Sequence, residues 1–466
     1  MPALAFRKCA GLCRGITDMK IETRFVTKLC LLLIAAFLAG GNVIAQEEGE
    51  RPQQKTKKAQ AVSKQVYDRI QKAQEQIDAE NYPSALKILG SLDASEKLTE
   101  YERQNVLNYI AYVQYSTDDI DGAMASYKRM LQIESIEEQI KKNTIYTLAQ
   151  LSTMQENYQD ALNYLNQWLP LEPNPQPDAF ILIAQNLYQL NRYADMVEPI
   201  ETAIRLAEEK GKQVKEDWYV LLNFAYFSQE DYQKVKEIQK IIIPKWPKKR
   251  YWFALAGAFT ELGDDINLLT SYDAAHTQGM LQKESELVTM AQLYMQHEIP
   301  YKAGTLLESA MESGQVARDA KNYRILSQAW MLAQEDEKAI PALKEAARLS
   351  DEGELFLRLG NTHLNLGQYG ECVAAIQNGV RKGGIKSPDN AQISLGMCLY
   401  NQQKYREAIT AFREAGKTRR SARVARQWIN VIESDIKRNE QIRLAEAAAR
   451  KQQQALTERR RATERI

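Results

Sequence analysis

Residues 395–415 read LGMCLYNQQKYREAITAFREA, and this stretch decides the fold. Gly396 stands nine residues before Tyr405, and an apolar stripe begins three residues after that tyrosine. The stripe includes Ala408 and Phe412, which are four residues apart and therefore share one face of a helix. Two antiparallel helices approach closely only where both carry small side chains, because large ones would overpack the contact. Gly396 and Ala408 thus predict a helix–turn–helix hairpin with Tyr405 in the turn.

The same spacing recurs along the chain with a period of 33 to 39 residues. The turn tyrosine is found at Tyr82, Tyr158, Tyr193, Tyr232, Tyr369 and Tyr405. The small-residue position lies nine residues before the turn position and is occupied by Ala73, Ala111, Ala149, Ala184, Asn223, Ala256, Ala291, Ser327, Gly360 and Gly396. A short period held over so many steps is typical of a solenoid of paired helices rather than of a globular enzyme.

This pattern resembles that of the tetratricopeptide repeat family, and the resemblance covers about residues 65–416. It implies an all-α fold, a right-handed solenoid of about ten helix–turn–helix repeats. Several repeats depart from the pattern. Met196, Val235 and Leu268 replace the small residue of the second helix, and the turn tyrosine is replaced by Ile120, Asp265, Pro300 and Asp336.

The family resemblance also implies a concave groove lined by the first helix of each repeat. Residues at fixed offsets from the small-residue position would face a partner there: Asn105, Asn108, Tyr112, Tyr115, Asn143, Tyr146, Gln150, Gln185, Tyr188, Asp217, Phe224, Phe227, Arg250 and Phe253. Amide side chains can pair with the backbone of an extended peptide, and rings supply buried area. The amides at Asn105, Asn108, Asn143 and Gln150 would be costly in an apolar core, which favours an open face. The alternative is that the rings form core between repeats.

The N-terminal segment 1–45 reads as a secretory signal peptide whose true start is Met19. Basic residues follow Met19, residues 29–39 are apolar, and Ala45 ends a small-residue cleavage site. The alternative, an uncleaved membrane anchor, would need an apolar run of about 20 residues. We therefore expect a protein that is soluble in the periplasm after cleavage and begins with a flexible leader at 46–64.

Only two cysteines, Cys372 and Cys398, remain once the signal segment is removed. They lie in adjacent repeats, so a disulfide is conceivable in an oxidising compartment. The other interpretation is two small buried side chains, and we favour it because Cys372 fills a position where alanine is usual.

Charge divides the chain into an acidic body and a basic end. Residues 46–416 contain 41 basic and 52 acidic residues, whereas residues 417–466 contain 14 and 6. In 417–437 the apolar residues are four apart, which predicts a capping helix that closes the repeats. These residues are Val424, Trp428, Ile432 and Ile436.

We expect residues 438–466 to form a basic polar helical tail. Its functional interpretation is peripheral contact with acidic lipid headgroups or with an acidic partner. The alternative is a solvated helix whose charges only keep it soluble.

The sequence offers no recognisable catalytic chemistry. His276, His297 and His363 lie on three different repeats, with no carboxylate or cysteine at ligand spacing, and phosphate-loop, nucleophile and zinc motifs do not occur. We expect no catalytic residues, no metal, no cofactor and no small-molecule substrate. Nucleic acid is not an expected partner either, since an exported acidic chain would not meet it. An exported enzyme with a degenerate site is the alternative.

The order of segments resembles the periplasmic tetratricopeptide repeat proteins that accompany TonB, ExbB and ExbD systems in gamma-proteobacteria. Residues 76–89 (QIDAENYPSALKIL) and 108–115 (NYIAYVQY) suggest this. The resemblance implies an accessory of energised iron-complex uptake that binds a protein or peptide of the cell envelope, with TonB, ExbB or ExbD as candidates. The alternative is an assembly factor for outer-membrane or wall-synthesis machinery.

Overall fold

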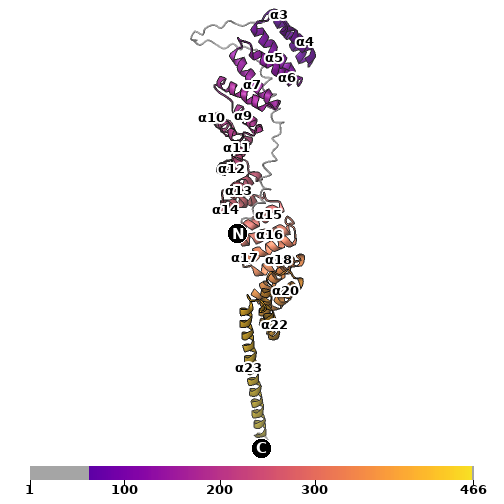
Figure 1. Ribbon diagram of the computed structural model, residues 1–466, viewed down its shortest axis with the longest axis vertical. Coiled ribbons are helices and arrows are strands. Elements are labelled where there is room, and N and C mark those ends of the chain that lie inside the picture. Colours follow the sequence, from indigo (N-terminus) through magenta and orange to yellow (C-terminus); the bar gives the residue numbers. More distant parts are fainter. Residues whose placement is uncertain (1–61, 464–466) are drawn as a thin grey trace. The chain divides into compact units, whose positions relative to one another are not determined.

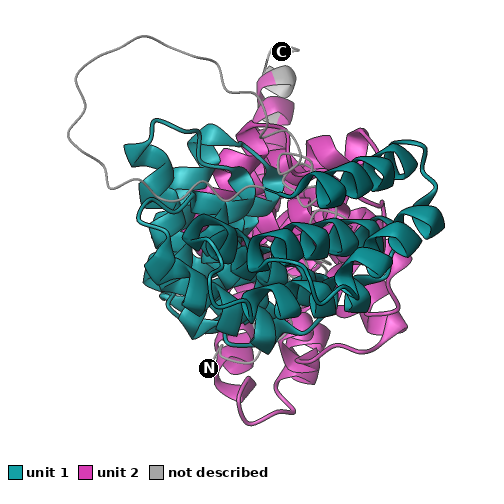
Figure 2. Ribbon diagram, turned by 90° about the horizontal axis from the view of Figure 1, so that it is seen from above, with its two compact units in different colours: residues 1–264 teal, residues 265–466 magenta. Residues whose placement is uncertain are grey.

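The computed structural model describes residues 62–463, so the expected signal peptide and most of the leader lie outside the described residues. Helices connected by short loops make up the described chain, and no strand occurs in it. The helices follow one another in chain order (Figure 1). Two compact units divide the chain at Asp264, as the two colours of Figure 2 show. None of the described helices combines the length and the hydrophobicity of a membrane span.

Unit 1 consists of helix pairs joined by tight turns. Its helices are α3 (Lys64–Asp78), α4 (Tyr82–Asp93), α5 (Glu100–Ser116), α6 (Ile120–Leu131), α7 (Glu138–Met154), α8 (Tyr158–Trp168), η2 (Leu169–Leu171), α9 (Pro177–Gln189), η3 (Ala194–Met196), α10 (Val197–Glu209), α11 (Glu216–Ser228), α12 (Tyr232–Lys245) and α13 (Lys249–Glu261). Consecutive helices pack against each other, both within a pair and from one pair to the next. The register is the one expected from the sequence, since α4, α8 and α12 begin at turn tyrosines.

Unit 2 repeats this arrangement and ends in a long helix. It contains α14 (Asp265–Thr277), α15 (Glu284–Gln296), α16 (Pro300–Glu312), α17 (Ala320–Leu332), α18 (Asp336–Leu349), α19 (Glu354–Asn365), α20 (Tyr369–Lys382), α21 (Pro388–Asn401), α22 (Tyr405–Ala415) and α23 (Ala422–Thr463). The unit boundary falls in the turn of the sixth expected repeat, so α13 ends unit 1 and α14 begins unit 2. The expectation of an all-α tetratricopeptide solenoid is confirmed.

Every hairpin turn has the same backbone conformation. In the first hairpin, the Glu80 N–H donates to Ile77 O (2.9 Å) and the Asn81 N–H donates to Gln76 O (2.8 Å). These are the two hydrogen bonds of a Schellman motif. The residue two before each turn position has φ between 56° and 72°: Glu80, Asp118, Glu156, Asn191, Glu230, Gly263, Glu298, Gln334, Gly367 and Gln403. Only two of these are glycine, so backbone hydrogen bonds hold a left-handed conformation that other side chains rarely adopt.

The small residues expected at the hairpin contacts are buried. Ala73, Ala111, Ala149 and their partners on the second helices are fully inaccessible. At Gly396 an added Cβ would lie 2.7 Å from the Phe412 ring, which explains the absence of a side chain there. Asn223 is the one amide at this position, and its Oδ1 accepts a hydrogen bond from Gln239 Nε2 at 2.8 Å.

Cys372 and Cys398 form a disulfide, so the favoured interpretation of two unlinked cysteines is wrong. Cys372 lies on α20 and Cys398 on α21, with a Cα–Cα distance of 6.2 Å and both side chains fully buried. The two helices pack against each other, which brings the small position of one repeat opposite the first helix of the next. A covalent bond therefore joins the last two hairpins.

The C-terminal segment is one helix, α23, rather than two separate elements. Its first part packs on the last hairpin: Ala425 and Ile432 are buried, and Tyr400 Oη donates to Asp435 at 2.7 Å. Val424, expected in the buried stripe, is 40% exposed, because Ala425 takes the inward position one residue later. From Lys437 onward every described side chain of α23 is exposed.

Candidate partner-binding face

The residues expected to meet a partner lie on the first helices of five consecutive hairpins of unit 1. They occupy α5, α7, α9, α11 and α13, at positions six and three residues before and one and four residues after the small-residue position. We call this surface the first-helix face. Asp217 and Arg250 are exposed, and most of the others are partly buried. Gln150 is buried at 8% exposure, so its expected place on an open face is wrong.

The aromatic residues of the face also pack on one another. Tyr188 and Phe224, from neighbouring hairpins, have ring centroids 5.1 Å apart, and Tyr193 lies 5.0 Å from Phe224. Tyr146 packs on Trp168 at 4.7 Å, and Tyr112 contacts the core of the first hairpins. These rings therefore fit both interpretations, as core between repeats and as part of a binding face. Each ring packs partly between helices and is partly exposed at the surface.

Three polar residues of the face have local hydrogen-bond partners. Asn105 Nδ2 donates to Tyr101 O at 2.8 Å, and Asn143 Oδ1 accepts from Gln139 Nε2 at 3.0 Å. The exposed guanidinium of Arg250 is bonded to Glu216 at 2.6 Å. Such partners lie within or next to the same helices, so the amide and guanidinium groups stay at the surface of the hairpins.

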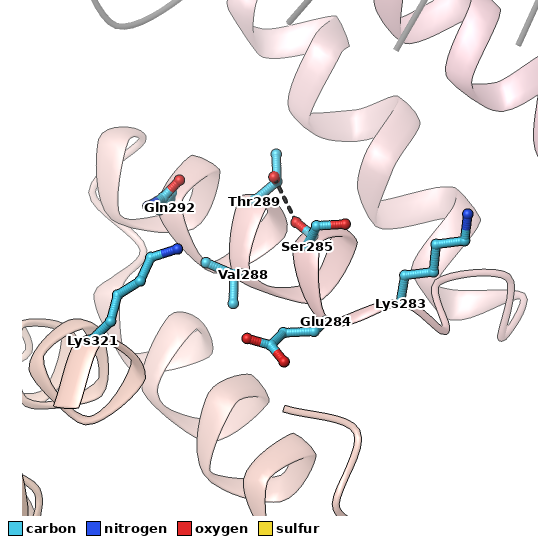
Figure 3. Close-up of a pocket in the computed structure, with 7 residues that line it drawn as sticks. All are labelled: Lys283, Glu284, Ser285, Val288, Thr289, Gln292 and Lys321. Atoms are coloured by element: carbon cyan, nitrogen blue, oxygen red, sulfur yellow. Dashed lines mark hydrogen bonds between the residues drawn. The ribbon is translucent and has the colours of Figure 1, made fainter. Parts of the chain in front are cut away.

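A pocket in unit 2 lies on the same kind of surface (Figure 3). Its volume is ≈ 560 Å³, and its lining residues are Lys283, Glu284, Ser285, Val288, Thr289, Gln292 and Lys321. Ser285, Val288 and Gln292 on α15 stand six and three residues before and one residue after Ala291, the offsets of the first-helix face. The pocket in unit 2 is therefore lined by residues at the same offsets as the expected binding residues of unit 1.

The charges of the pocket come from both neighbouring hairpins. The Lys321 side chain extends from α17 toward Gln292 (Figure 3). Glu284 Oε1 accepts from Asn322 Nδ2 at 2.9 Å, and its Oε2 accepts from the Ala317 N–H at 3.3 Å. The carboxylate therefore holds α15 to the next hairpin, and the Lys321 side chain lines the pocket. Sequence reasoning missed this pocket, although the same offsets applied to Ala291 and Ser327 would have found it.

Glu284 belongs to a recurrent contact that we call the repeat clasp. A carboxylate in the first turn of a first helix bonds to the start of the next hairpin. The clasp residues are Glu100, Asp178, Glu216, Glu284, Glu354 and Asp389, the last of which bonds to the start of α23 instead of a hairpin. Sequence reasoning did not predict the clasp, because the partner of each carboxylate lies a whole repeat away.

The clasp lowers the pKa of three of its carboxylates, those of Glu100, Glu216 and Asp389. Burial disfavours the charged form of Glu216, but hydrogen bonds from Lys248, Tyr251 and Arg250 outweigh it and lower the pKa of Glu216 to about 2. Asp389 accepts from Ser421 Oγ at 2.6 Å, and this bond, with those from Thr418 and Arg420, lowers the pKa of Asp389. A related carboxylate, Glu102, bonds back to Ser63 before the first hairpin. There burial raises its pKa, but the bonds from Ser63 and Thr99 together lower it to about 2.

Within residues 62–463, no three side chains of the metal-binding types gather into a ligand set. His363 is buried, and its Nδ1 lies 2.6 Å from Gln368 Oε1, next to the turn of its hairpin. This geometry explains that histidine as part of the hairpin structure.

The family model described as tetratricopeptide repeat matches residues 357–422, which span most of α19 and all of α20 to α22. The match supports the tetratricopeptide repeat family. Tetratricopeptide repeats are helix pairs of this kind, and members of the family generally bind protein or peptide partners. A search of curated proteins found no match.

Three solved structures illustrate the likeness to known proteins. The MamA protein is 19% identical over 36% of this chain and 88% of its own, with a TM-score of 0.31. A tetratricopeptide repeat protein from Parabacteroides merdae is 15% identical over 57% of this chain and 99% of its own, with a TM-score of 0.33. YrrB, described as a TPR protein with an unusual peptide-binding site, is 15% identical over 41% and 97%, also at 0.33. TM-scores this low carry no argument about function.

Proposed function

We propose that this protein is a non-enzymatic scaffold that binds a protein or peptide partner on its first-helix face. The observation behind the proposal is the pocket on α15 and α17, because its lining repeats the offsets of the expected binding residues in unit 1. Each of the two units thus has side chains at these same offsets on the surface of its first helices.

The chemistry of the face suits an extended polypeptide. Amides such as Asn108 and Gln292 can donate and accept hydrogen bonds with a peptide backbone. Half-exposed rings such as Phe224 and Phe227 can cover apolar side chains of the partner at low entropic cost. Lys321 would favour an acidic group opposite the pocket.

Export to the periplasm is part of the proposal. It is supported by the signal-like segment at 1–45 and by the buried disulfide between Cys372 and Cys398, a bond that persists in oxidising compartments. Cell fractionation with a thiol-reactive label would test this location. We expect the protein in the periplasmic fraction, with both cysteines blocked; a cytoplasmic protein with free thiols would contradict it.

The finer proposal is an accessory role in a TonB-type uptake system, with TonB, ExbB or ExbD as the partner. Deleting the gene should then slow growth when an iron complex is the only iron source, and supply of soluble ferrous iron should restore it. Normal iron-dependent growth together with envelope defects would favour an assembly factor instead. Either result leaves the scaffold proposal standing.

Photo-crosslinking in living cells tests the scaffold itself. A photoreactive residue at Gln292 or Tyr146 should capture one defined protein, because both positions lie on the first-helix face. Exposed second-helix positions, Lys87 and Lys128, serve as matched controls. Equal capture from the second-helix positions, or none from the face, would contradict the proposed surface.

A further inference from the structure

The first helices of unit 1 share a distribution of charge that the second helices lack. In α5, α7, α9 and α11 every charged residue lies within the first five residues, and the rest of each helix has none. The second helices differ, since α10 and α12 contain five charged residues each. The charge-free stretches of the first helices are 104–117, 143–155, 179–191 and 218–229.

These stretches are not simply buried. On α9 and α11 their partly exposed side chains at the offsets of the first-helix face are Gln185, Tyr188, Phe224 and Phe227. Charged groups occur only at the starts of the two helices, where Asp178 binds Lys215 at 2.8 Å and Asp217 is exposed. An ion of a partner that covered the middle of this surface would lose hydration and gain no opposite charge. The surface therefore favours an uncharged segment.

The rings of α9 and α11 form one continuous cluster. Tyr188 on α9 and Phe224 on α11 have ring centroids 5.1 Å apart and an interplanar angle of 63°. Tyr193, in the turn after α9, lies 5.0 Å from Phe224 at 89°. Phe227, one turn after Phe224, packs edge-on against Tyr232 at 6.1 Å. Because edge-to-face packing holds these rings in place, they lose little conformational entropy when a partner covers them.

Hydrogen-bond donors stand beside the rings. Among the residues that the structure describes, neither the Gln185 amide nor the Tyr188 hydroxyl has a hydrogen-bond partner. Both groups can donate to a carbonyl oxygen. A proline-containing segment in the polyproline II conformation has unpaired carbonyl groups, since this conformation has no internal hydrogen bonds and proline has no N–H. Donors next to rings therefore suit the backbone of such a segment.

The spacing of the helices also fits polyproline II. Successive first helices lie side by side, as the contact between Tyr188 and Phe224 shows. Helices packed in this way are about 8–10 Å apart. Polyproline II has three residues per turn and rises about 9 Å per turn, so every third residue would meet the same offset on the next first helix. In a β-strand the side chains on one side recur about every 7 Å, which does not match.

We propose that the ring cluster of α9 and α11 binds an uncharged, proline-containing segment of the partner in the polyproline II conformation. This inference rests on the proposed scaffold function and specifies the chemistry of the partner. Surfaces lined by rings are a known recognition mode for such segments, whose stiff backbone loses little entropy on binding. Tyr112 on α5 and Tyr146 on α7 continue the row of partly exposed rings. At three residues per helix, a segment of about twelve residues would span the four helices.

Selection from a display library of random dodecapeptides tests the inference. The purified protein should enrich peptides that have prolines three residues apart and lack charged residues. The variant Tyr188→Leu, Phe224→Leu keeps apolar side chains in the contact but removes the flat rings, and it should not enrich these peptides.

A selected peptide, synthesised with a fluorescent label, gives the affinities. It should bind the ring variant about tenfold more weakly than the unaltered protein, and replacing its prolines with alanine should weaken binding to a similar extent. Its binding to the unaltered protein should change by less than about twofold between roughly 0.05 and 0.5 M salt, because no ion pair forms.

Two further variants guard against a loss of folding. Tyr164→Leu, Tyr301→Leu removes rings from the second helices α8 and α16, and it should select and bind the same peptides as the unaltered protein. Gln185→Met keeps the length of the side chain but removes the amide donor without changing the ring cluster. It should weaken binding by about two- to tenfold. Circular dichroism should show the same helix content in all forms.

Several results would overturn the inference. These are selection of charged or proline-free peptides, selection of the same peptides by the ring variant, and no selection at all. Photo-crosslinking at Tyr146 separates this outcome from the scaffold proposal. A defined protein captured there through a charged or proline-free segment would refute only the polyproline II segment, whereas no capture together with no selection would refute both.

Discussion

At the scale of single residues, the clasp carboxylate of Glu216 connects stability to pH. The ordinary pKa of a glutamate is 4.5, and that of Glu216 is lowered to about 2 by its bonds to Lys248, Tyr251 and Arg250. A carboxyl group whose pKa falls on folding stabilises the folded state above its unfolded pKa. That contribution is lost as the pH falls from about 4.5 toward 2.

Replacing Glu216 with glutamine should therefore lower stability at neutral pH and reduce its dependence on acid. We expect a loss of roughly 1 to 3 kcal/mol in the free energy of unfolding at pH 7, and a smaller loss at pH 3. Urea unfolding at the two pH values measures this. Asp217→Asn, at the exposed neighbouring position, is the matched control. An equal effect of Glu216→Gln at both pH values would show that its charge is not involved.

The turn residues give a second test at this scale. Gly367 has a φ of 72°, and a Cβ there would meet nothing closer than 3.8 Å, so only the backbone disfavours a side chain. Gly367→Ala should lower stability by about 1 kcal/mol.

Gly370, three residues later on α20, is the matched control. Its added Cβ has no neighbour within 4 Å, and its φ is not positive, so Gly370→Ala should be neutral or slightly stabilising. Thermal melts of both variants decide the point. If the two substitutions had the same effect, the left-handed turn would not be the cause.

At the scale of helices, the disulfide holds the last two hairpins together. Cys372 and Cys398 are 26 residues apart, and closing a loop of that size stabilises a fold by about 3 kcal/mol. Reduction should lower the unfolding midpoint in urea, because α20 and α21 then separate more easily.

The Cys372→Ala, Cys398→Ala variant checks this, since alanine suits the small buried positions. Its midpoint should match that of the reduced protein and should not respond to reductant. An unaltered protein that is equally stable with and without reductant would contradict the bond.

The two parts of α23 should contribute differently to stability. Removal of 438–466 takes away side chains that are exposed wherever the structure describes them, and it should shift the melting temperature by less than about 2 °C. Removal from Ser421 onward also strips Ala425, Trp428 and Ile432 from the last hairpin and should lower it by several degrees. Calorimetry of both truncations measures the difference, and equal shifts would mean that the whole helix stabilises the body.

At the scale of the whole molecule, the repeat period predicted most of the fold. The period places a small residue and a turn in each hairpin, and these local features persist even where Met196, Val235 and Leu268 replace small residues. Contacts between distant positions were not predictable. The clasp joins residues about 30 positions apart, and the disulfide depends on how two repeats stack. Val424 and Ala425 are adjacent in α23, so spacing in the sequence could not decide which of the two side chains is buried.

The binding face was predictable in position but not in form. Offsets from the small residue place Phe224 and Tyr188 on the right helices, yet spacing alone cannot say how far a ring sinks between them. Gln150 illustrates this, because an amide can be buried when its surroundings are partly polar. The pocket beside Lys321 could not be predicted from one repeat, because side chains of two hairpins line it.

The turns made by backbone hydrogen bonds offer a practical opportunity. Eight of the ten left-handed positions already hold acidic or amide side chains such as Glu80 and Asn191, so these turns can carry a side chain. A spin label or a fluorophore attached at these positions would mark every hairpin in turn. Pairs of such labels would form a molecular ruler that reports bending of the protein when a partner binds.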